Sequence, residues 1–276
     1  IINRSHLTGV LYLENNLVTG AFKQDRLELL SLLSSQIAVS IENALLYENL
    51  EQKVTERTEE LEEEKHKSDK LLLNILPFEI AEELRTKGTT LPRKFKKVTV
   101  MFTDFQGFTQ LSETMSPEEL VNELDKHFSA FDEIIGKYKL EKIKTIGDSY
   151  MCVGGLPVPN STHATDTVKA GLEILEYMEK NKEYCKLNGK PIFEMRIGLH
   201  SGPVIAGVVG SKKFVYDIWG DAVNTASRME SSGVAGKLNV SETTYESIKN
   251  DFNCTFRGKI EAKNKGEIDM YFVDNK

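Results

Sequence analysis

The chain has 276 residues, of which 40% are hydrophobic and 28% are charged, and its formal net charge is −7. This length is enough for one full-sized domain and additional segments. The acidic balance argues against a nucleic-acid-binding protein, because phosphate contacts require clustered Lys and Arg. The three cysteines lie far apart, which predicts free thiols in a reducing compartment rather than a disulfide framework: Cys152, Cys185 and Cys254.

The beginning of the chain, Ile1-Ile2-Asn3, has neither the basic head nor the apolar core of a signal peptide. No apolar run approaches the ~20 residues of a membrane span, so we expect no membrane segment in this sequence. Because no initiator Met opens it, we interpret the sequence as a piece of a longer protein with room upstream for a sensor or a membrane anchor. We expect a cytoplasmic location.

Residues 1–46 look like the end of a separate domain. The pattern of residues 9–14, GVLYLE, predicts a strand, and residues 25–47 predict a helix with an apolar stripe. Together these segments resemble the closing strand and helix of a GAF sensory domain. So short a fragment cannot enclose a ligand pocket, and we therefore expect it to act as a dimerising helix.

Residues 47–91 predict a linker formed by a coiled coil and a short helix. If Tyr47 is heptad position a, seven of the ten a and d positions as far as Phe78 are apolar, which favours a parallel coiled coil. The alternative is a solvated, charge-rich helix, which would form no dimer. Pro77 should bend or restart the helix, and a polar stretch places the next domain boundary near Leu91.

Residues 92–276 predict a domain in which strands and helices alternate. Ser116-Pro117-Glu118-Glu119 is a capping box that starts a helix to about Tyr138. A second helix should begin at Ser161 or Thr162 and end near Tyr184. Further elements are expected along the rest of the chain: strands over 193–200 and 204–209 joined at 201–203, a helix over 221–231, and strands near 238, 255 and 270. This order predicts an α+β sandwich of the ferredoxin-like type.

Two aspartates stand at the ends of predicted neighbouring strands. The alternating segment that begins at Val98 ends in Asp104, and residues 142–155, KIKTIGDSYMCVGG, form a predicted hairpin with Asp148 at its tip. Each aspartate alone is equally compatible with a turn or helix cap. Brought together by the fold, two carboxylates on rigid strand ends would suit Mg²⁺, which leaves its other positions to phosphate and water.

The stretches FTDFQGFT, around Asp104, and KTIGDSYM, around Asp148, strongly resemble the catalytic domain of class III nucleotidyl cyclases. The resemblance covers about residues 92–276, implies the ferredoxin-like cyclase fold and assigns two metal ions, Mg²⁺ or Mn²⁺, to the two aspartates. Leu71 to Arg85 likewise resembles the short transducing helix that precedes many such domains. In that family the metal aspartates come from one subunit and the base-reading residues from the other. The resemblance therefore implies a homodimer, held through the coiled coil and the catalytic domains.

Lys144 and Asp217 are the candidates for recognition of the purine base. Adenine presents an acceptor at N1 and a donor at N6, whereas guanine presents the reverse pair. Because lysine only donates and an ionised aspartate only accepts, the pair fits adenine and is mispaired against guanine. Related guanylyl cyclases typically hold a Glu and a Cys or another small residue at these places. Taken alone, Lys144 would be interpreted as a solvated strand lysine.

Asn224 and Arg228 are four residues apart, so a helix places both on one face. The resemblance assigns Asn224 to binding of the ribose and Arg228 to stabilisation of the charge on the α-phosphate. The planar donor fork of arginine suits phosphate oxygens. It also assigns Lys263 to the terminal phosphates, although the usual KGKG motif here reads KNKG. His200 has no partner at ligand spacing, and we interpret it as a structural histidine.

The sequence therefore predicts an adenylyl cyclase that converts ATP into 3′,5′-cyclic AMP and pyrophosphate by a two-metal-ion mechanism. The active sites are expected at a homodimer interface under the control of an upstream sensor. Two alternatives stay open at this point. One is a guanylyl cyclase, and the other is a catalytically silent nucleotide-binding or dimerising module.

Overall fold

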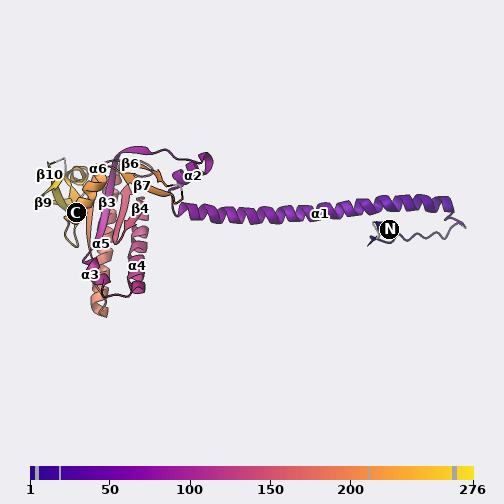
Figure 1. The fold of residues 1–276 in the computed structure, drawn as a ribbon, viewed down its shortest axis with the longest axis horizontal. Helices are drawn as coiled ribbons and strands as arrows, with labels where there is room; N and C mark the ends of the chain where they lie inside the picture. The colour runs from indigo at the N-terminus through magenta and orange to yellow at the C-terminus, as the bar shows by residue number, and fades with distance from the viewer. Residues whose placement is uncertain (4–5, 19, 211, 263–265) are drawn as a thin grey trace. The chain divides into compact units, whose positions relative to one another are not determined.

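A computed structural model describes residues 1–3, 6–18, 20–210, 212–262 and 266–276 of the chain (Figure 1). The chain divides into two compact units, Ile1–Leu71 and Leu72–Lys276. In the first unit, β1 (Ile2–Asn3) and β2 (His6–Leu7) pair with each other. The strand predicted over residues 9–14 is wrong, because these residues form no regular secondary structure. A strand requires a row of backbone hydrogen bonds to a neighbour, and in this stretch the described residues show them only between Gly9 and Ile1.

Helix α1 (Gln24–Leu73) continues without a break through both the predicted end-of-domain helix and the predicted connector. Its sequence contains neither Gly nor Pro, so no residue interrupts the backbone ladder of hydrogen bonds. The apolar side chains at the predicted heptad positions are exposed, with Leu50 at 55%, Val54 at 59% and Leu61 at 70%. In a coiled coil, these side chains would be exposed on one helix alone and covered by the second helix. The coiled coil therefore stays a prediction.

By length and composition, α1 is the one helix among the described residues that is apolar enough to cross a membrane. Between Leu29 and Leu46, Glu42 is the one charged residue. The same composition also occurs in helices that another protein chain covers. The expectation that this sequence holds no membrane segment is therefore not confirmed.

The second unit is built on an eight-stranded sheet in the order β4-β5-β3-β6-β8-β10-β9, with β7 paired to β6. Neighbouring strands are antiparallel except for β6 and β8. The strands are β3 (Arg93–Gln106), β4 (Glu141–Ile146), β5 (Ser149–Gly154), β6 (Glu194–Val209), β7 (Val215–Trp219), β8 (Leu238–Ser241), β9 (Asn253–Ala262) and β10 (Gly266–Asp274). The helices are α2 (Phe78–Lys87), α3 (Phe108–Ser112), α4 (Pro117–Lys137), α5 (His163–Asn188), α6 (Asp221–Ser231) and α7 (Glu242–Ile248).

The segment β3-α4-β4-β5-α5-β6 has the strand order of a ferredoxin-like sandwich, so the predicted α+β fold is confirmed. Helix α4 starts with the predicted capping box, in which Ser116 and Glu119 bond each other's backbone N–H groups. Pro77 precedes the first residue of α2, as predicted. Helices α4 and α5 run side by side along the sheet (Figure 1).

The two faces of the sheet carry different cores, because alternate residues of a strand point in opposite directions. Met101 and Phe105 of β3 pack among residues of α4 and α5. Val100 and Phe102 pack among residues of α2 and α6. Asp104 follows Phe102 by two positions, which places it on the α6 face.

The two strands predicted over 193–200 and 204–209 are in fact one strand, β6, which passes through the predicted turn. Strand β3 pairs with β6 on both sides of Pro203, with an irregularity between Phe95 and Val98. On its other side, β6 pairs with β8 only as far as Leu199 and with β7 only from Ile205. Pro203 therefore stands where no ladder hydrogen bond needs its missing N–H.

Candidate active site

Asp104 lies near the end of β3, directly opposite Arg196 of β6 in the strand register. The Nη2 atom of Arg196 donates to Oδ2 of Asp104 at 2.7 Å, and both side chains are 24% exposed. A guanidinium and a carboxylate at this distance form a strong charge-assisted hydrogen bond. The second oxygen, Oδ1, has no partner that the structure shows in the described part of the chain.

Asp148 occupies the tip of the β4–β5 hairpin, after Gly147, whose φ of 62° a glycine adopts without strain. The hairpin is anchored beside β3 because Thr103 pairs with Tyr150. Burial first, and the negative charge of Asp104 second, raise the pKa of the Asp148 carboxyl above its ordinary value. The fold thus brings the two predicted metal ligands close enough to repel each other.

Two carboxylates are a sparse ligand set for a metal. Among the described residues, no cluster of three or more His, Cys, Asp or Glu side chains has the arrangement of a metal site. Mg²⁺ fits such a pair, because it is commonly bound by one or two carboxylates together with substrate phosphates and water. The site is therefore chemically suited to a metal whose remaining ligands are water or substrate phosphates.

Lys144 of β4 and Asp217 of β7 meet although they are far apart in the sequence. The Nζ atom of Lys144 donates to Oδ2 of Asp217 at 2.6 Å. The other oxygen of Asp217 accepts from the backbone N–H of Ile218 at 2.9 Å, which fixes the carboxylate. The structure thus places the two predicted base-reading residues together within one chain.

Asn224 and Arg228 both lie on α6, as predicted, and Asn224 is exposed. Arg228 donates through Nη1 to the carbonyl oxygen of Glu261, near the end of β9, at 3.0 Å. Lys263 lies outside the described residues. Within the described chain, no hydrogen bond or ion pair joins the aspartate pair to the Lys144–Asp217 pair or to Asn224 and Arg228.

Two charged residues that the sequence analysis missed, Arg196 and Glu230, adjoin the aspartate pair. The Nε atom of Arg196 lies 3.1 Å from Oε1 of Glu230, which is buried at the end of α6. Burial first, and the charge of Asp104 second, raise the pKa of Glu230 to about 7. The available signal was the one arginine in the strand predicted over residues 193–200, in the stretch MRIGLH.

His200 is buried, and its Nδ1 lies 2.7 Å from Oγ of Ser241. Its neighbour in the chain, Ser201, belongs to a buried group of hydroxyls with Thr99 and Thr244, at 2.8 and 3.0 Å. Hydrogen bonds among these buried polar side chains offset the free-energy cost of removing them from water. This setting agrees with a structural histidine.

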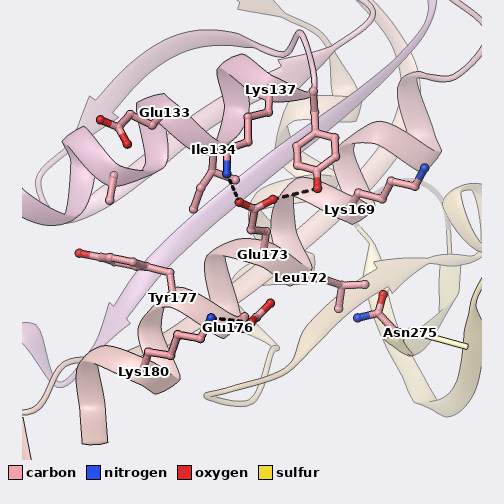
Figure 2. A pocket seen from close by; sticks show the side chains of 12 residues that line it. Glu133, Ile134, Lys137, Lys169, Leu172, Glu173, Glu176, Tyr177, Lys180 and Asn275 are labelled. Carbon is pink, nitrogen blue, oxygen red and sulfur yellow. Dashed lines mark hydrogen bonds and ion pairs between the residues drawn. The ribbon is translucent and has the colours of Figure 1, made fainter. Parts of the chain in front are cut away.

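A hollow of about 520 Å³ between α4 and α5 contains none of the predicted site residues (Figure 2). Four of the six charged side chains that line it pair with each other. Glu173 accepts hydrogen bonds from Lys137 and Tyr138, and Lys180 donates to Glu176. Ion pairs of this kind at an open surface are common and do not indicate a ligand.

Comparisons with known proteins support the class of protein that this geometry suggests. The family profile of the adenylate and guanylate cyclase catalytic domain matches residues 91–275. The chain is 41% identical over 221 residues to an adenylate cyclase from Mycobacterium tuberculosis, a match that covers 79% of this chain and 49% of that protein. It is 42% identical over 232 residues to retinal guanylyl cyclase 2 from Mus musculus, covering 83% of this chain and 21% of that protein.

Among solved structures, the chain resembles the catalytic core of a rhodopsin-guanylyl cyclase with converted specificity in complex with ATPαS. The TM-score is 0.63 at 37% sequence identity, and the match covers 68% of this chain and 100% of that one. The chain therefore belongs to the adenylate and guanylate cyclases and carries their catalytic domain over residues 91–275. It spans about half of the M. tuberculosis relative and about a fifth of the mouse relative.

The N-terminal part matches a different family from the one that its sequence suggested. The profile called Heme NO binding associated matches residues 24–84, which include all of α1 and part of α2. The GAF resemblance of residues 1–46 is not supported. The pattern behind it combined an expected strand that does not form with an apolar helical stripe that many signalling helices share.

Proposed function

We propose that this chain is an adenylyl cyclase, which converts ATP into 3′,5′-cyclic AMP and pyrophosphate in a homodimer. The contact between Lys144 and Asp217 carries the choice of ATP, because its atoms lie 2.6 Å apart and Asp217 is only 13% exposed. The relatives include enzymes named for both nucleotides. The chemistry of this pair, rather than overall similarity, therefore selects the substrate.

The pair fits adenine in the following way. The ammonium group of Lys144 has three N–H donors, and the bond to Asp217 uses one, which leaves donors for N1 of adenine. The carboxylate of Asp217 has lone pairs left to accept from the N6 amino group. Against guanine, the lysine would face N1–H and the carboxylate would face O6, so both groups would be mispaired. An enzyme whose site is built to hydrogen-bond one base discriminates strongly against a base that leaves those groups mispaired.

Asp104 and Asp148 would hold two Mg²⁺ or Mn²⁺ ions. When bound, such ions lower the pKa of the ribose 3′-hydroxyl and neutralise the triphosphate. The protein contributes two carboxylates on strand ends whose positions the β3–β5 and β3–β6 pairings fix. Arg228 would balance the charge on the α-phosphate, and Asn224 would orient the ribose. Lys263 is proposed for the terminal phosphates.

A dimer would combine these groups into complete sites. Among the described residues of one chain, no hydrogen bond or ion pair joins the metal carboxylates to the base-reading pair, which agrees with two sites that each draw on both chains. Exposed apolar residues flank the base-reading pair, with Ile205 at 47% and its cross-strand partner Trp219 at 41%. Free cysteines support a reducing, cytoplasmic location.

Turnover of ATP and GTP in parallel, with Mg²⁺ and with Mn²⁺, tests the proposal. We expect cyclic AMP to form with a kcat/KM at least ~100-fold above that for GTP. A preference for GTP would favour a guanylyl cyclase instead. Binding of ATP by the purified dimer without release of pyrophosphate would favour a catalytically silent module.

Mixing two inactive variants tests the shared site. Asp104→Ala and Arg228→Ala chains should each be inactive, because every site in either homodimer lacks one essential group. In the mixture, heterodimers would contain one intact site and one doubly defective site. Activity should therefore reappear on mixing, whereas an inactive mixture of folded chains would contradict the shared site.

Control by an upstream sensor is part of the proposal, and α1 is the segment through which a signal would pass. Because α1 is continuous, insertion of residues at Glu62 would rotate one end of the helix against the other. In the full-length protein, such insertions should change regulation with a helical period. Regulation that is indifferent to insertion length would argue against this route.

A further inference from the structure

Arg196 stands between two carboxylates that come from different elements. Its Nη2 donates to Asp104 of β3 at 2.7 Å, and its Nε lies 3.1 Å from Glu230 of α6. The Glu230 side chain is only 9% exposed, so this second ion pair is largely shielded from solvent. Removing one partner of such a pair is strongly unfavourable, unlike loss of a surface salt bridge.

The close approach of α6 to β6 makes this contact possible. Gly198 lies two residues beyond Arg196 on the same face of β6. A Cβ atom added at Gly198 would lie 1.9 Å from the backbone nitrogen of Glu230 and 2.4 Å from its Cα. Only glycine therefore allows the last turn of α6 to rest on the strand, where Glu230 can reach the guanidinium.

Two side chains fix the same end of α6 from other strands. Asn239 of β8 donates through Nδ2 to the carbonyl oxygen of Met229 at 2.7 Å. Arg257 of β9 donates through Nη1 to the carbonyl oxygen of Ser232 at 2.6 Å. The backbone on both sides of Glu230 is thus held in place, with the carboxylate beside the guanidinium of Arg196.

We propose that Arg196 and Glu230 are positioning residues for the metal carboxylate. Glu230 fixes the guanidinium fork of Arg196, and the fork holds Oδ2 of Asp104, which leaves Oδ1 for a metal ion shared with Asp148. The planar fork of arginine can hold two carboxylates at once, whereas the point charge of a lysine does not fix their geometry. Partners of this kind commonly change metal affinity 10- to 100-fold.

The same ion pairs connect the metal carboxylate to the helix that carries Asn224 and Arg228. Glu230 follows Arg228 by two positions on α6. If the proposed homodimer is correct, these residues of α6 serve the site that contains the partner's aspartates. The link from Asp104 through Arg196 to Glu230 then joins the two active sites of the dimer through two partly shielded ion pairs.

Mn²⁺ binding to the nucleotide-free full chain, measured by electron paramagnetic resonance of the free ion, tests the positioning role. Glu230→Gln keeps the shape of the side chain and should weaken Mn²⁺ binding about tenfold. Glu183→Gln makes the same change on the exposed surface of α5 and should leave binding unchanged. Equal Mn²⁺ affinity of Glu230→Gln and the unmodified chain would overturn the proposal.

Arg196→Lys separates geometry from charge, because it keeps the positive charge and loses the fork. We expect it to weaken Mn²⁺ binding about as much as Glu230→Gln does, and the combined variant to be no weaker than either alone. Unchanged affinity in Arg196→Lys, or additive losses, would overturn the proposal. If Arg196→Lys does not fold, Glu230→Gln alone decides.

Steady-state kinetics of Glu230→Gln provide a second readout. The Mn²⁺ concentration for half-maximal activity should rise about tenfold, while the KM for ATP at saturating Mn²⁺ stays the same. A fall in kcat with an unchanged metal requirement would show a merely structural role. If the unmodified chain makes no cyclic nucleotide, the proposed function fails, and the metal-binding measurement still decides the positioning role.

Discussion

Lys144 and Asp217, which are separated by 73 positions, form an ion pair with a distance of 2.6 Å between Nζ and Oδ2. Strand β4 supplies the lysine and strand β7 supplies the aspartate. Neither strand pairs with the other, so the contact depends on how both are arranged around the rest of the sheet. This arrangement presents one donor and one acceptor side by side, which is a pattern for reading a purine edge.

Exchange of this pair should change the preferred nucleotide. In a Lys144→Glu/Asp217→Cys variant, the new carboxylate at position 144 would accept a hydrogen bond from N1–H of guanine. The carboxylate of Asp217, which would repel O6 of guanine, would be absent. We expect the ratio of kcat/KM for ATP to that for GTP to fall at least ~100-fold. Lys142→Glu reverses the charge of a neighbouring lysine that pairs with Asp132, and it should leave the ratio unchanged.

Replacement of Asp104 by Asn should lower the pKa of Asp148. The charge of Asp104 is the second-largest cause, after burial, that raises the pKa of the Asp148 carboxyl in the metal-free protein. Without that charge, ionisation of Asp148 becomes easier. Carbon-13 NMR of labelled aspartates measures this change, and Asp251→Asn at an exposed position serves as the control. An unchanged titration of Asp148 would show that the carboxyls do not interact.

His127 should make the fold less stable in mild acid. Burial first, and Lys126 second, lower the pKa of this fully buried imidazole to about 4. Above about pH 6.5 the imidazole is neutral in both states; below it, the unfolded chain takes up a proton that the folded chain resists. Stability is therefore lost as the pH falls from 6.5 towards 4.

His127→Phe removes this titration while it keeps an aromatic ring beside Phe105 and Phe193. Relative to this variant, the unmodified chain should lose about 2 kcal/mol of unfolding free energy between pH 7 and pH 5. Urea unfolding at both pH values measures the difference. Parallel stability curves for the two proteins would contradict the assignment.

Gly198→Ala should destabilise the catalytic unit by at least ~2 kcal/mol, because its Cβ would overlap the backbone of Glu230. Gly136→Ala is the matched control. Gly136 lies in α4 with no atom within 4 Å of its added Cβ, so alanine there should stabilise by about 0.5–1 kcal/mol. Thermal unfolding of both variants measures the contrast. A stable Gly198→Ala protein would mean that α6 does not rest on β6 at this point.

Charged substitutions on the exposed apolar stripe of α1 should weaken the dimer. Val54→Asp/Leu61→Asp places carboxylates at two predicted heptad a positions that are 59% and 70% exposed in the single chain. We expect the dimer dissociation constant to rise at least ~10-fold in sedimentation experiments. Thr55→Asp, one residue away from the stripe, should have little effect. Equal dissociation constants would show that α1 does not form the predicted coiled coil.

Sequence patterns alone predicted the elements that depend on residues close together in the chain. The capping box at Ser116 predicted the start of α4, and the alternation that begins at Val98 predicted β3. The motifs around Asp104 and Asp148 predicted the class of protein. The turn predicted at residues 201–203 failed, because the registers of β3, β7 and β8 leave Pro203 free of any ladder bond and allow β6 to continue.

The sequence by itself allowed α1 to continue over 50 residues, because none of them is a Gly or Pro that would interrupt the backbone hydrogen bonds. It also determined which residue types could bind a metal and a purine. Only the tertiary structure decided that Arg196 joins Asp104 to Glu230 and that Lys144 reaches Asp217. The physical reason is that such contacts depend on strand register and on the approach of a helix to a glycine, and neither leaves a periodic signal in the chain.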